Sequence, residues 1–165
     1  MQNEQGDSAM VRSWSFLIIF LSLFFLALMA ASWGHCDQKA PPSNDEIRQV
    51  LDSQVAAWNK GDLKGFMAGY WKSEKLTFFS GDNVEHGWQA TYDRYQKRYQ
   101  AEGREMGTLT FSELEVEMVG PDTAWVRGRW KLDTSKEKPG GLFTLVFKKL
   151  PEGWRIVHDH TSAGQ

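Results

Sequence analysis

The stretch Trp154-Arg-Ile-Val-His-Asp-His-Thr-Ser162 ends a long run of alternating side chains near the C-terminus. Such alternation predicts a β-strand, because successive side chains of a strand point to opposite faces of a sheet. Strict alternation predicts one face with Trp154, Ile156, His158 and His160, and an opposite face with Arg155, Val157 and Asp159. The sequence therefore predicts that two imidazoles share one surface, while Asp159 points away, either toward Arg127 or Arg129 or into a dimer interface.

The same period of two extends back from this strand to Gly107. The apolar residues Leu109 and Phe111 occupy odd-numbered positions, whereas the apolar residues from Leu114 onward occupy even-numbered positions. This switch predicts a β-bulge or bend near Ser112-Glu113, as curved sheets require. Two further strands are predicted over residues 123–132 and 142–150, with turns at 120–122 and 151–153.

The first half of the folded part has helical spacing instead. The capping box Ser43-Asn-Asp-Glu46 predicts the start of a helix that Gly61 ends, and Asp62 then caps a second helix reaching Trp71. Short strands at 76–79 and 84–86 precede a third helix over 88–100. The order predicts an α+β fold in which a cone-shaped, curved antiparallel sheet wraps around about three N-terminal helices.

A hydrophobic segment precedes this domain. Residues 16–31 are almost wholly apolar, Arg12 comes before them, and small residues come after them. That order predicts a secretory signal peptide, and the run is also about long enough to be an uncleaved membrane anchor. We therefore expect a signal or anchor over 1–35, a linker over 36–43 and the domain over 44–165. The domain is expected to be exported (periplasmic or extracellular), or membrane-anchored outside the cytoplasm.

Composition excludes some classes of function. Lys and Arg number 19 against 21 Asp and Glu, and no basic stripe points to nucleic acid. The lone Cys36 cannot form an internal disulfide, so stability must come from core packing. The 8 Trp and 10 Phe residues favour a well-filled core or an aromatic-lined pocket.

Several segments together resemble one known family. They are Ala57-Trp-Asn-Lys-Gly-Asp62, Asp122-Thr-Ala-Trp-Val126, Phe143-Thr-Leu-Val-Phe-Lys-Lys149 and Gly153 to Ser162. They resemble the nuclear transport factor 2-like superfamily and its SnoaL-like group, and the last is also similar to the association domain of calcium/calmodulin-dependent kinase II. The resemblance implies a conical α+β barrel, often dimeric through its outer sheet face, with a pocket between sheet and helices. Members range from isomerases, cyclases, dehydratases and epoxide hydrolases to non-catalytic domains, so no single reaction is implied.

Candidate site residues are indicated by the same pattern. Because imidazoles exchange protons near neutral pH, His158 and His160 are candidate catalytic groups, with the phenol of Tyr92 as a candidate donor. The candidate ligand-binding residues are the aromatic and imidazole side chains Tyr70, Trp71, Trp88, Tyr92, Trp130, His158 and His160, and Tyr95 is a further aromatic candidate for the pocket wall. Gly128 is expected to leave room for a ligand beside Trp130.

Other kinds of site find less support. The His-x-His pair suits a metal, but the spacing supplies no third ligand, so neither a metal nor a cofactor is expected. The sequence contains no glycine-rich phosphate loop, no nucleophile motif and no complete pair of acid and base groups. The leading hypothesis is a small-molecule binding domain that forms a homodimer. The alternatives are an isomerase, cyclase or hydrolase with a His base, and a dimerisation or assembly module with a vestigial pocket.

Overall fold

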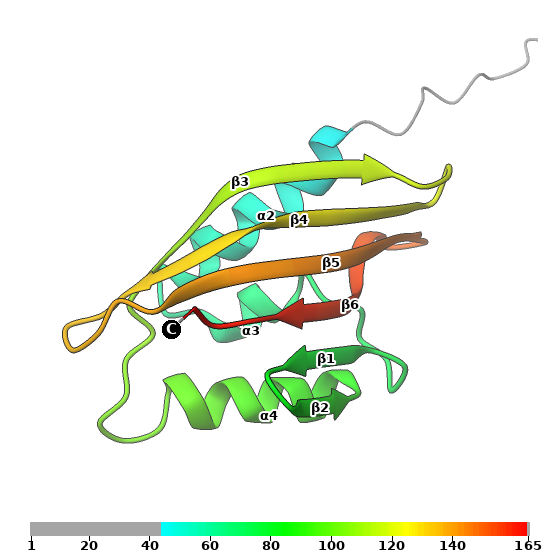
Figure 1. Cartoon of the computed structure of the whole chain (residues 1–165). Coiled ribbons are helices and arrows are strands. Elements are labelled where there is room, and N and C mark those ends of the chain that lie inside the picture. Colours follow the sequence, from blue (N-terminus) through cyan, green and yellow to red (C-terminus); the bar gives the residue numbers. More distant parts are fainter. Residues whose placement is uncertain (1–43, 165) are drawn as a thin grey trace, which may run out of the picture. The chain divides into compact units, whose positions relative to one another are not determined.

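The computed structural model describes residues 44–164 of the chain (Figure 1). The predicted signal or anchor, the linker and the capping residue Ser43 lie outside the described residues. Within 44–164, no helix has the length and apolar character needed to cross a membrane. The α+β class predicted from the sequence is confirmed for this part of the chain.

Three helices form in the first half of the domain, namely α2 (Asn44–Trp58), α3 (Leu63–Met67) and α4 (Trp88–Tyr99). Asp62 caps α3 as predicted, since its carboxylate accepts the backbone N–H of Gly65 at 2.8 Å. The prediction that this helix reaches Trp71 was wrong. The backbone of residues 69–71 pairs with the last strand instead, with Trp71 N–H donating to the Ile156 carbonyl at 2.9 Å. A segment that gives its donors to a strand cannot continue an α-helix.

Six strands form one curved, unclosed sheet in the order β2-β1-β6-β5-β4-β3. Their bounds are β1 (Thr77–Ser80), β2 (Asn83–His86), β3 (Thr108–Met118), β4 (Thr123–Asp133), β5 (Gly140–Leu150) and β6 (Gly153–Thr161). Neighbouring strands are antiparallel except β1 and β6, which run parallel. The parallel pair joins the short hairpin of the first half to the long strands of the second.

Two bulges set which side chains face inward. The first lies where the sequence predicts it, since the β3–β4 register shifts between Ser112 and Glu115, and Glu113 has a φ of 52°. The second was not predicted. In β6, Ile156 pairs with Phe147 and His158 pairs with Val146, which leaves Val157 as an extra residue without a partner. An extra residue reverses the facing of every side chain beyond it.

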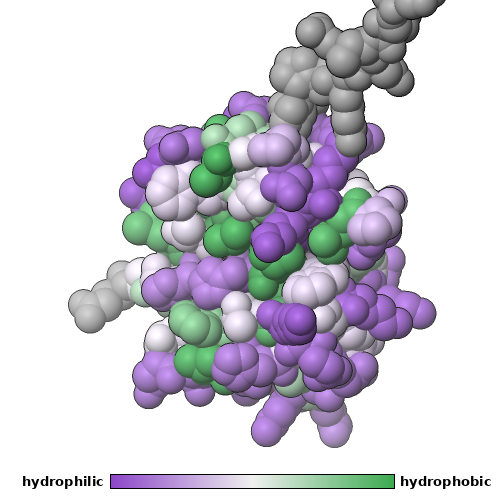
Figure 2. All heavy atoms as spheres, turned by 90° about the vertical axis from the view of Figure 1, so that its right-hand side faces the viewer, coloured by the Kyte–Doolittle hydropathy of each residue, from purple (hydrophilic) through white to green (hydrophobic). Residues whose placement is uncertain are grey.

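The core lies between the helices and the inner face of the sheet. Figure 1 shows α2 and α3 on one face of the long strands, with α4 alongside the β1–β2 hairpin. Ile47 and Leu51 of α2 are fully buried beside Phe147 and Ile156 of the sheet. At the end of the domain that carries the β3–β4 turn, hydrophobic side chains lie in small patches among hydrophilic ones (Figure 2).

Candidate functional site

A cavity of about 330 Å³ opens between the inner face of the sheet and the helices. Its walls are mainly aromatic, contributed by Trp58, Phe66, Tyr70, Phe78, Tyr95, Tyr99, Phe111, Trp130 and Phe143. Its charged lining groups are Arg94, Arg98 and Asp159, and Gln54, Ser80, Asn83 and Thr161 add neutral polar groups. An apolar cavity with a few convergent polar groups is the usual form of a small-molecule site.

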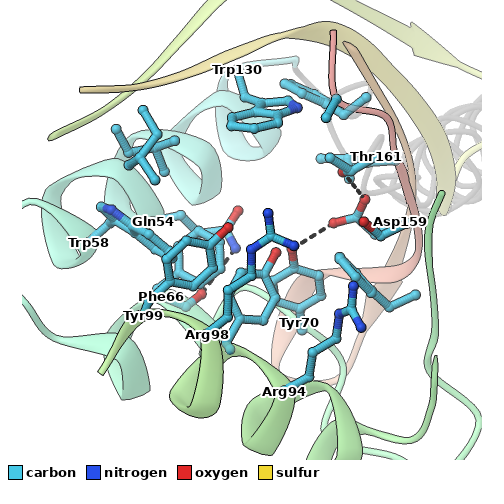
Figure 3. A pocket seen from close by; sticks show the side chains of 18 of the residues that line it. Gln54, Trp58, Phe66, Tyr70, Arg94, Arg98, Tyr99, Trp130, Asp159 and Thr161 are labelled. Atoms are coloured by element: carbon cyan, nitrogen blue, oxygen red, sulfur yellow. Dashed lines mark hydrogen bonds between the residues drawn. The ribbon is translucent and has the colours of Figure 1, made fainter. Parts of the chain in front are cut away.

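Asp159 is the carboxylate of this cavity. It lies on β6 and is only 2% exposed. Its Oδ2 accepts a hydrogen bond from the Tyr70 hydroxyl at 2.7 Å, and its Oδ1 accepts one from the Thr161 hydroxyl at 2.6 Å (Figure 3). Both oxygens therefore have a hydroxyl donor, which makes burial of this acidic side chain tolerable.

Burial sets the acidity of the group. Loss of hydration raises the pKa of the Asp159 carboxyl to about 6, and the hydrogen bonds from Thr161 and Tyr70 act in the opposite direction. Burial also raises the pKa of the Tyr70 phenol well above its usual value, with the charge of Asp159 as the next cause. Burial followed by the same charge raises the pKa of Tyr95. The cavity thus contains a carboxyl that exchanges a proton near neutral pH, beside phenols that stay protonated.

Edge-to-face aromatic contacts hold the helical wall of the cavity. The ring of Trp58 lies 4.9 Å from that of Phe66 and 4.9 Å from that of Tyr99, at interplanar angles of 71° and 76°. The Trp58 indole N–H donates to the Met106 carbonyl at 2.8 Å, which fixes the ring between helix and sheet. Gln54, behind it, donates to the Phe66 carbonyl at 3.0 Å. Such contacts favour a preformed cavity.

Two arginines, one turn apart on α4, line the same cavity. Arg94 is half-buried, its guanidinium lies 5.8 Å from the centre of the Phe78 ring, and one nitrogen lies 3.5 Å from a Glu85 oxygen. Arg98 is exposed to solvent and lies 5.6 Å from the centre of the Tyr99 ring. Positive charge therefore stands on the α4 side of the cavity, opposite the sheet.

Among the residues predicted from the sequence, Tyr70, Tyr95 and Trp130 line the cavity, and Trp71, Trp88, Tyr92, His158 and His160 do not. Trp88 and Tyr92 stack on each other at 5.2 Å, and the Trp88 indole donates to the Met67 carbonyl at 3.0 Å. This pair thus joins α4 to α3 and does not turn toward the cavity. The expected space at Gly128 is taken by a protein ring, because a Cβ there would meet the Phe143 ring at 2.7 Å.

The facing predicted for the end of β6 was wrong, and the bulge at Val157 is the reason. Beyond it, Asp159 and Thr161 face the cavity. His158 lies on the outer face, where its Nδ1 is 2.6 Å from the Thr77 hydroxyl oxygen, and His160 on the same face is exposed. Burial, followed by the charge of His160, lowers the pKa of His158.

The suggestion that Asp159 pairs with Arg127 or Arg129 is likewise wrong. Arg127 pairs with Glu115 at 3.0 Å, and Arg129 pairs with Glu113 at 2.8 Å. Reasoning from sequence also missed Tyr99 and both cavity arginines as lining residues. Their spacing on α4 was visible, but not which of its faces turns to the cavity. Within residues 44–164, no cluster of three or more metal-ligating side chains occurs.

Known proteins share both the sequence pattern and the fold of this domain. A model of the SnoaL-like domain matches residues 47–164. An NTF-2-like protein of unknown function from Shewanella oneidensis MR-1 is 39% identical, over 72% of this chain and 98% of that one, with a TM-score of 0.68. No match was found among curated proteins.

Two more distant structures share the fold. An NTF2-like superfamily protein from Salmonella enterica serovar Typhimurium LT2 is 20% identical, over 74% of this chain and 91% of its own, with a TM-score of 0.61. A putative calcium/calmodulin-dependent protein kinase type II association domain from Thiobacillus denitrificans is 22% identical, over 72% and 94% of the two chains, with a TM-score of 0.60.

Proposed function

Because the chain belongs to the SnoaL-like domain family of the nuclear transport factor 2-like superfamily, we propose that it binds a small organic molecule in the cavity around Asp159. The observation that carries this proposal is that one cavity combines a mainly aromatic wall with the buried carboxyl of Asp159. A cavity of about 330 Å³ is at the small end of the range of ligand sites, which suits a molecule with one or two rings.

The polar groups of the cavity support the same function. A wall built only to pack would be expected to exclude a carboxyl, since burying one costs free energy. Here Asp159 is retained and held by Tyr70 and Thr161 at short distance. When ionised, this fixed carboxyl can accept a hydrogen bond from a ligand hydroxyl, and when protonated it can donate one to a ligand carbonyl. We also propose that binding takes place outside the cytoplasm, because the segment 16–31 has the pattern of a signal or anchor.

Blocking the cavity tests the proposal. Ser80, the last residue of β1, lines the cavity, so Ser80→Phe is expected to fill part of it and to remove ligand binding. Asp82 lies in the adjoining β1–β2 turn but does not line the cavity, so Asp82→Phe is the matched control. Thermal shift measurements with a metabolite panel are expected to identify a compound that stabilises wild type and D82F but not S80F. A panel without any stabilising compound, or equal stabilisation of all three proteins, would contradict the proposal.

Proton transfer is a second candidate function, and the protonation behaviour of Asp159 favours it. A carboxyl with a pKa of about 6 is half-ionised at about pH 6 and mainly ionised at physiological pH, where it can act as a general base. Asp159 would take the proton of a bound C–H or O–H group, and Tyr70 would stabilise the carboxylate. This assignment replaces His158 and His160 as the catalytic candidates, because the imidazoles lie outside the cavity lining.

Isotope exchange separates binding from catalysis. A carbonyl compound that binds the cavity is incubated with the protein in D₂O, and loss of its α-hydrogen signals is followed by ¹H NMR. Wild type is expected to accelerate exchange, while Asp159→Asn retains binding and loses exchange. Exchange that is equally fast in wild type and D159N would exclude Asp159 as the base and leave binding as the function.

A further inference from the structure

The charged groups of the cavity are unequal in number. Within the described chain, Arg94 and Arg98 line it from α4, whereas Asp159 is the acidic side chain in its lining. The two arginines are four residues apart on one helix, so both reach the same wall. The cavity therefore carries more cationic than anionic groups before any ligand binds.

Asp159 does not neutralise these arginines. Its two oxygens accept the hydroxyls of Tyr70 and Thr161, and no ion pair links it to an arginine in residues 44–164. Arg94 has a carboxylate neighbour in Glu85, at 3.5 Å. Arg98, by contrast, has no carboxylate partner in the part of the chain that the structure describes.

The position of Arg98 suits contact with a ligand. Its guanidinium is 5.6 Å from the centre of the Tyr99 ring, and its side chain extends from α4 into the space among the lining side chains (Figure 3). It also lines a second cavity, of about 320 Å³, to which Arg104 and Lys136 add positive charge and Glu105 and Glu137 add negative charge. A guanidinium presents planar N–H donors that fit the two oxygens of a carboxylate. Because Arg98 is exposed, an anion in solvent can reach its guanidinium directly.

We propose that the ligand is a carboxylic acid with a body of one or two rings, whose carboxylate binds Arg98 while its rings fill the aromatic part of the cavity. The proposal rests on the proposed binding function and names its ligand class. The aromatic wall accounts for the ring body, and the cavity volume limits the body to this size. Arg94, one turn away, adds to the positive potential felt by the carboxylate.

Pairs of acids and their amides test this inference, because each pair has nearly the same shape and differs in charge. The probes are benzoate, 2-naphthoate and indole-3-acetate, each with its primary amide, titrated by calorimetry at pH 7.5 into the full chain as recovered from expressing cells. At least one acid is expected to bind about tenfold more tightly than its amide, the factor that one charge-assisted hydrogen bond supplies. Acids that bind no better than their amides would overturn the proposal.

Variants on α4 locate the effect. Arg98→Gln is expected to lower acid affinity about tenfold and to leave amide affinity within about twofold, so that the preference for the acid disappears. Lys97→Gln removes a positive charge from the adjacent position, which does not line the cavity, and is expected to keep the preference. Arg98→Lys keeps the charge without the planar fork and is expected to fall between them. Full preference in R98Q, or an equal loss in K97Q, would overturn the role of Arg98.

The failures of the two proposals are distinguishable. If neutral compounds bind wild type but not S80F, and no acid is preferred, the cavity binds ligands and the carboxylic acid class is wrong. If no acid, amide or panel compound binds, both proposals fail. Phenyl phosphate is included as a second anion, and tighter, Arg98-dependent binding of it than of benzoate would overturn the choice of a carboxylate.

Discussion

Asp159 is the residue on which the chemistry of the cavity depends. A strand that presents apolar side chains to a core would be more stable with an apolar residue there, because an ionised carboxyl loses its hydration on burial. The hydroxyls of Tyr70 and Thr161 offset part of that cost by donating to its two oxygens. Retention of a group that costs stability is typical of functional sites.

The first prediction concerns stability against pH. The folded pKa of Asp159 is about 6, above the ordinary value of 3.8, so the native state binds the proton more tightly than the unfolded chain. Stability from this group is therefore full below about pH 4 and falls as pH rises through about 6, by about 3 kcal/mol in all. Asp159→Asn lacks this titration. The difference in unfolding free energy, wild type minus D159N, is expected to fall between pH 4 and 7 in urea titrations.

A second variant tests how the hydrogen bond from Tyr70 contributes to the pKa of Asp159. Tyr70→Phe removes a donor that favours the charged form, so the pKa of Asp159 is expected to rise further and the pH window to move upward. The phenols of Tyr70 and Tyr95 face Asp159 and stay neutral in this range, and His160, on the opposite face of β6, has a charge that lowers the pKa of Asp159. A wild type minus D159N difference that is flat, or rises with pH, would contradict the assignment.

The site could be predicted from the sequence only as far as the first residues of the last strand. Trp154 and Ile156 face the core as alternation predicts, but Val157 is the extra residue of a bulge and reverses the facing of residues 158–161. The bulge at Ser112-Glu113 was predictable, because the apolar positions change parity there. Beyond Val157 both parities carry polar side chains, so no change of apolar parity marks the second bulge.

At the scale of elements, the side chain of Asn59, just after the end of α2, makes two hydrogen bonds to the backbone at the start of β3. The Asn59 amide donates to the Leu109 carbonyl at 3.1 Å, and its oxygen accepts the Leu109 N–H at 2.7 Å. The Asn59 amide thus makes the pair of hydrogen bonds that a neighbouring strand would make. Because side chains of both α2 and β3 line the cavity, this contact fixes two parts of the cavity wall relative to each other.

Asn59→Ala is the prediction at this scale. It removes both hydrogen bonds and leaves the N–H and carbonyl groups of the buried Leu109 without these partners, so a loss of about 2 kcal/mol in unfolding free energy is expected. Ser53→Ala, on the exposed side of α2, removes one hydrogen bond to the Gln49 carbonyl within the helix and is expected to change stability by less than about 0.5 kcal/mol. Urea denaturation of the two variants checks this, and equal stability of N59A and wild type would contradict it.

Local elements were predictable and their long-range pairing was not. Apolar periodicity and capping residues place the helices and the strand meander close to their observed bounds. The parallel pairing of β1 with β6 joins residues 77–80 to residues 158–161, and no local pattern encodes a contact at that separation. The helix predicted to reach Trp71 ends at Met67 for the same reason, since the backbone after it pairs with β6.

At the scale of the whole domain, the outer face of the sheet exposes large apolar side chains. Cross-strand register places Trp125 beside Val146 and Arg129 beside Leu142 on this face. Trp125 is 40% exposed and Leu142 is 52% exposed. Salt bridges from Arg127 to Glu115 and Glu117 border the apolar side chains on the β3 edge. A face with exposed large apolar groups and a charged border has the composition of a protein–protein interface.

We therefore propose that two copies associate through this outer face, and Trp125→Glu is the test. A central Trp commonly contributes about 2 kcal/mol or more to an interface, so its replacement by a charge is expected to weaken dimers about 30-fold or more. Val119→Glu is the matched control, because Val119 is 65% exposed but lies in the β3–β4 turn, beyond the end of β3. Light scattering across a dilution series is expected to give dimers for wild type and V119E, and monomers for W125E. A monomeric wild type, or dimers of all three, would contradict this interface. A third outcome would favour the assembly module with a vestigial pocket. In that case the protein would form a stable larger oligomer, and its cavity would bind none of the compounds tested.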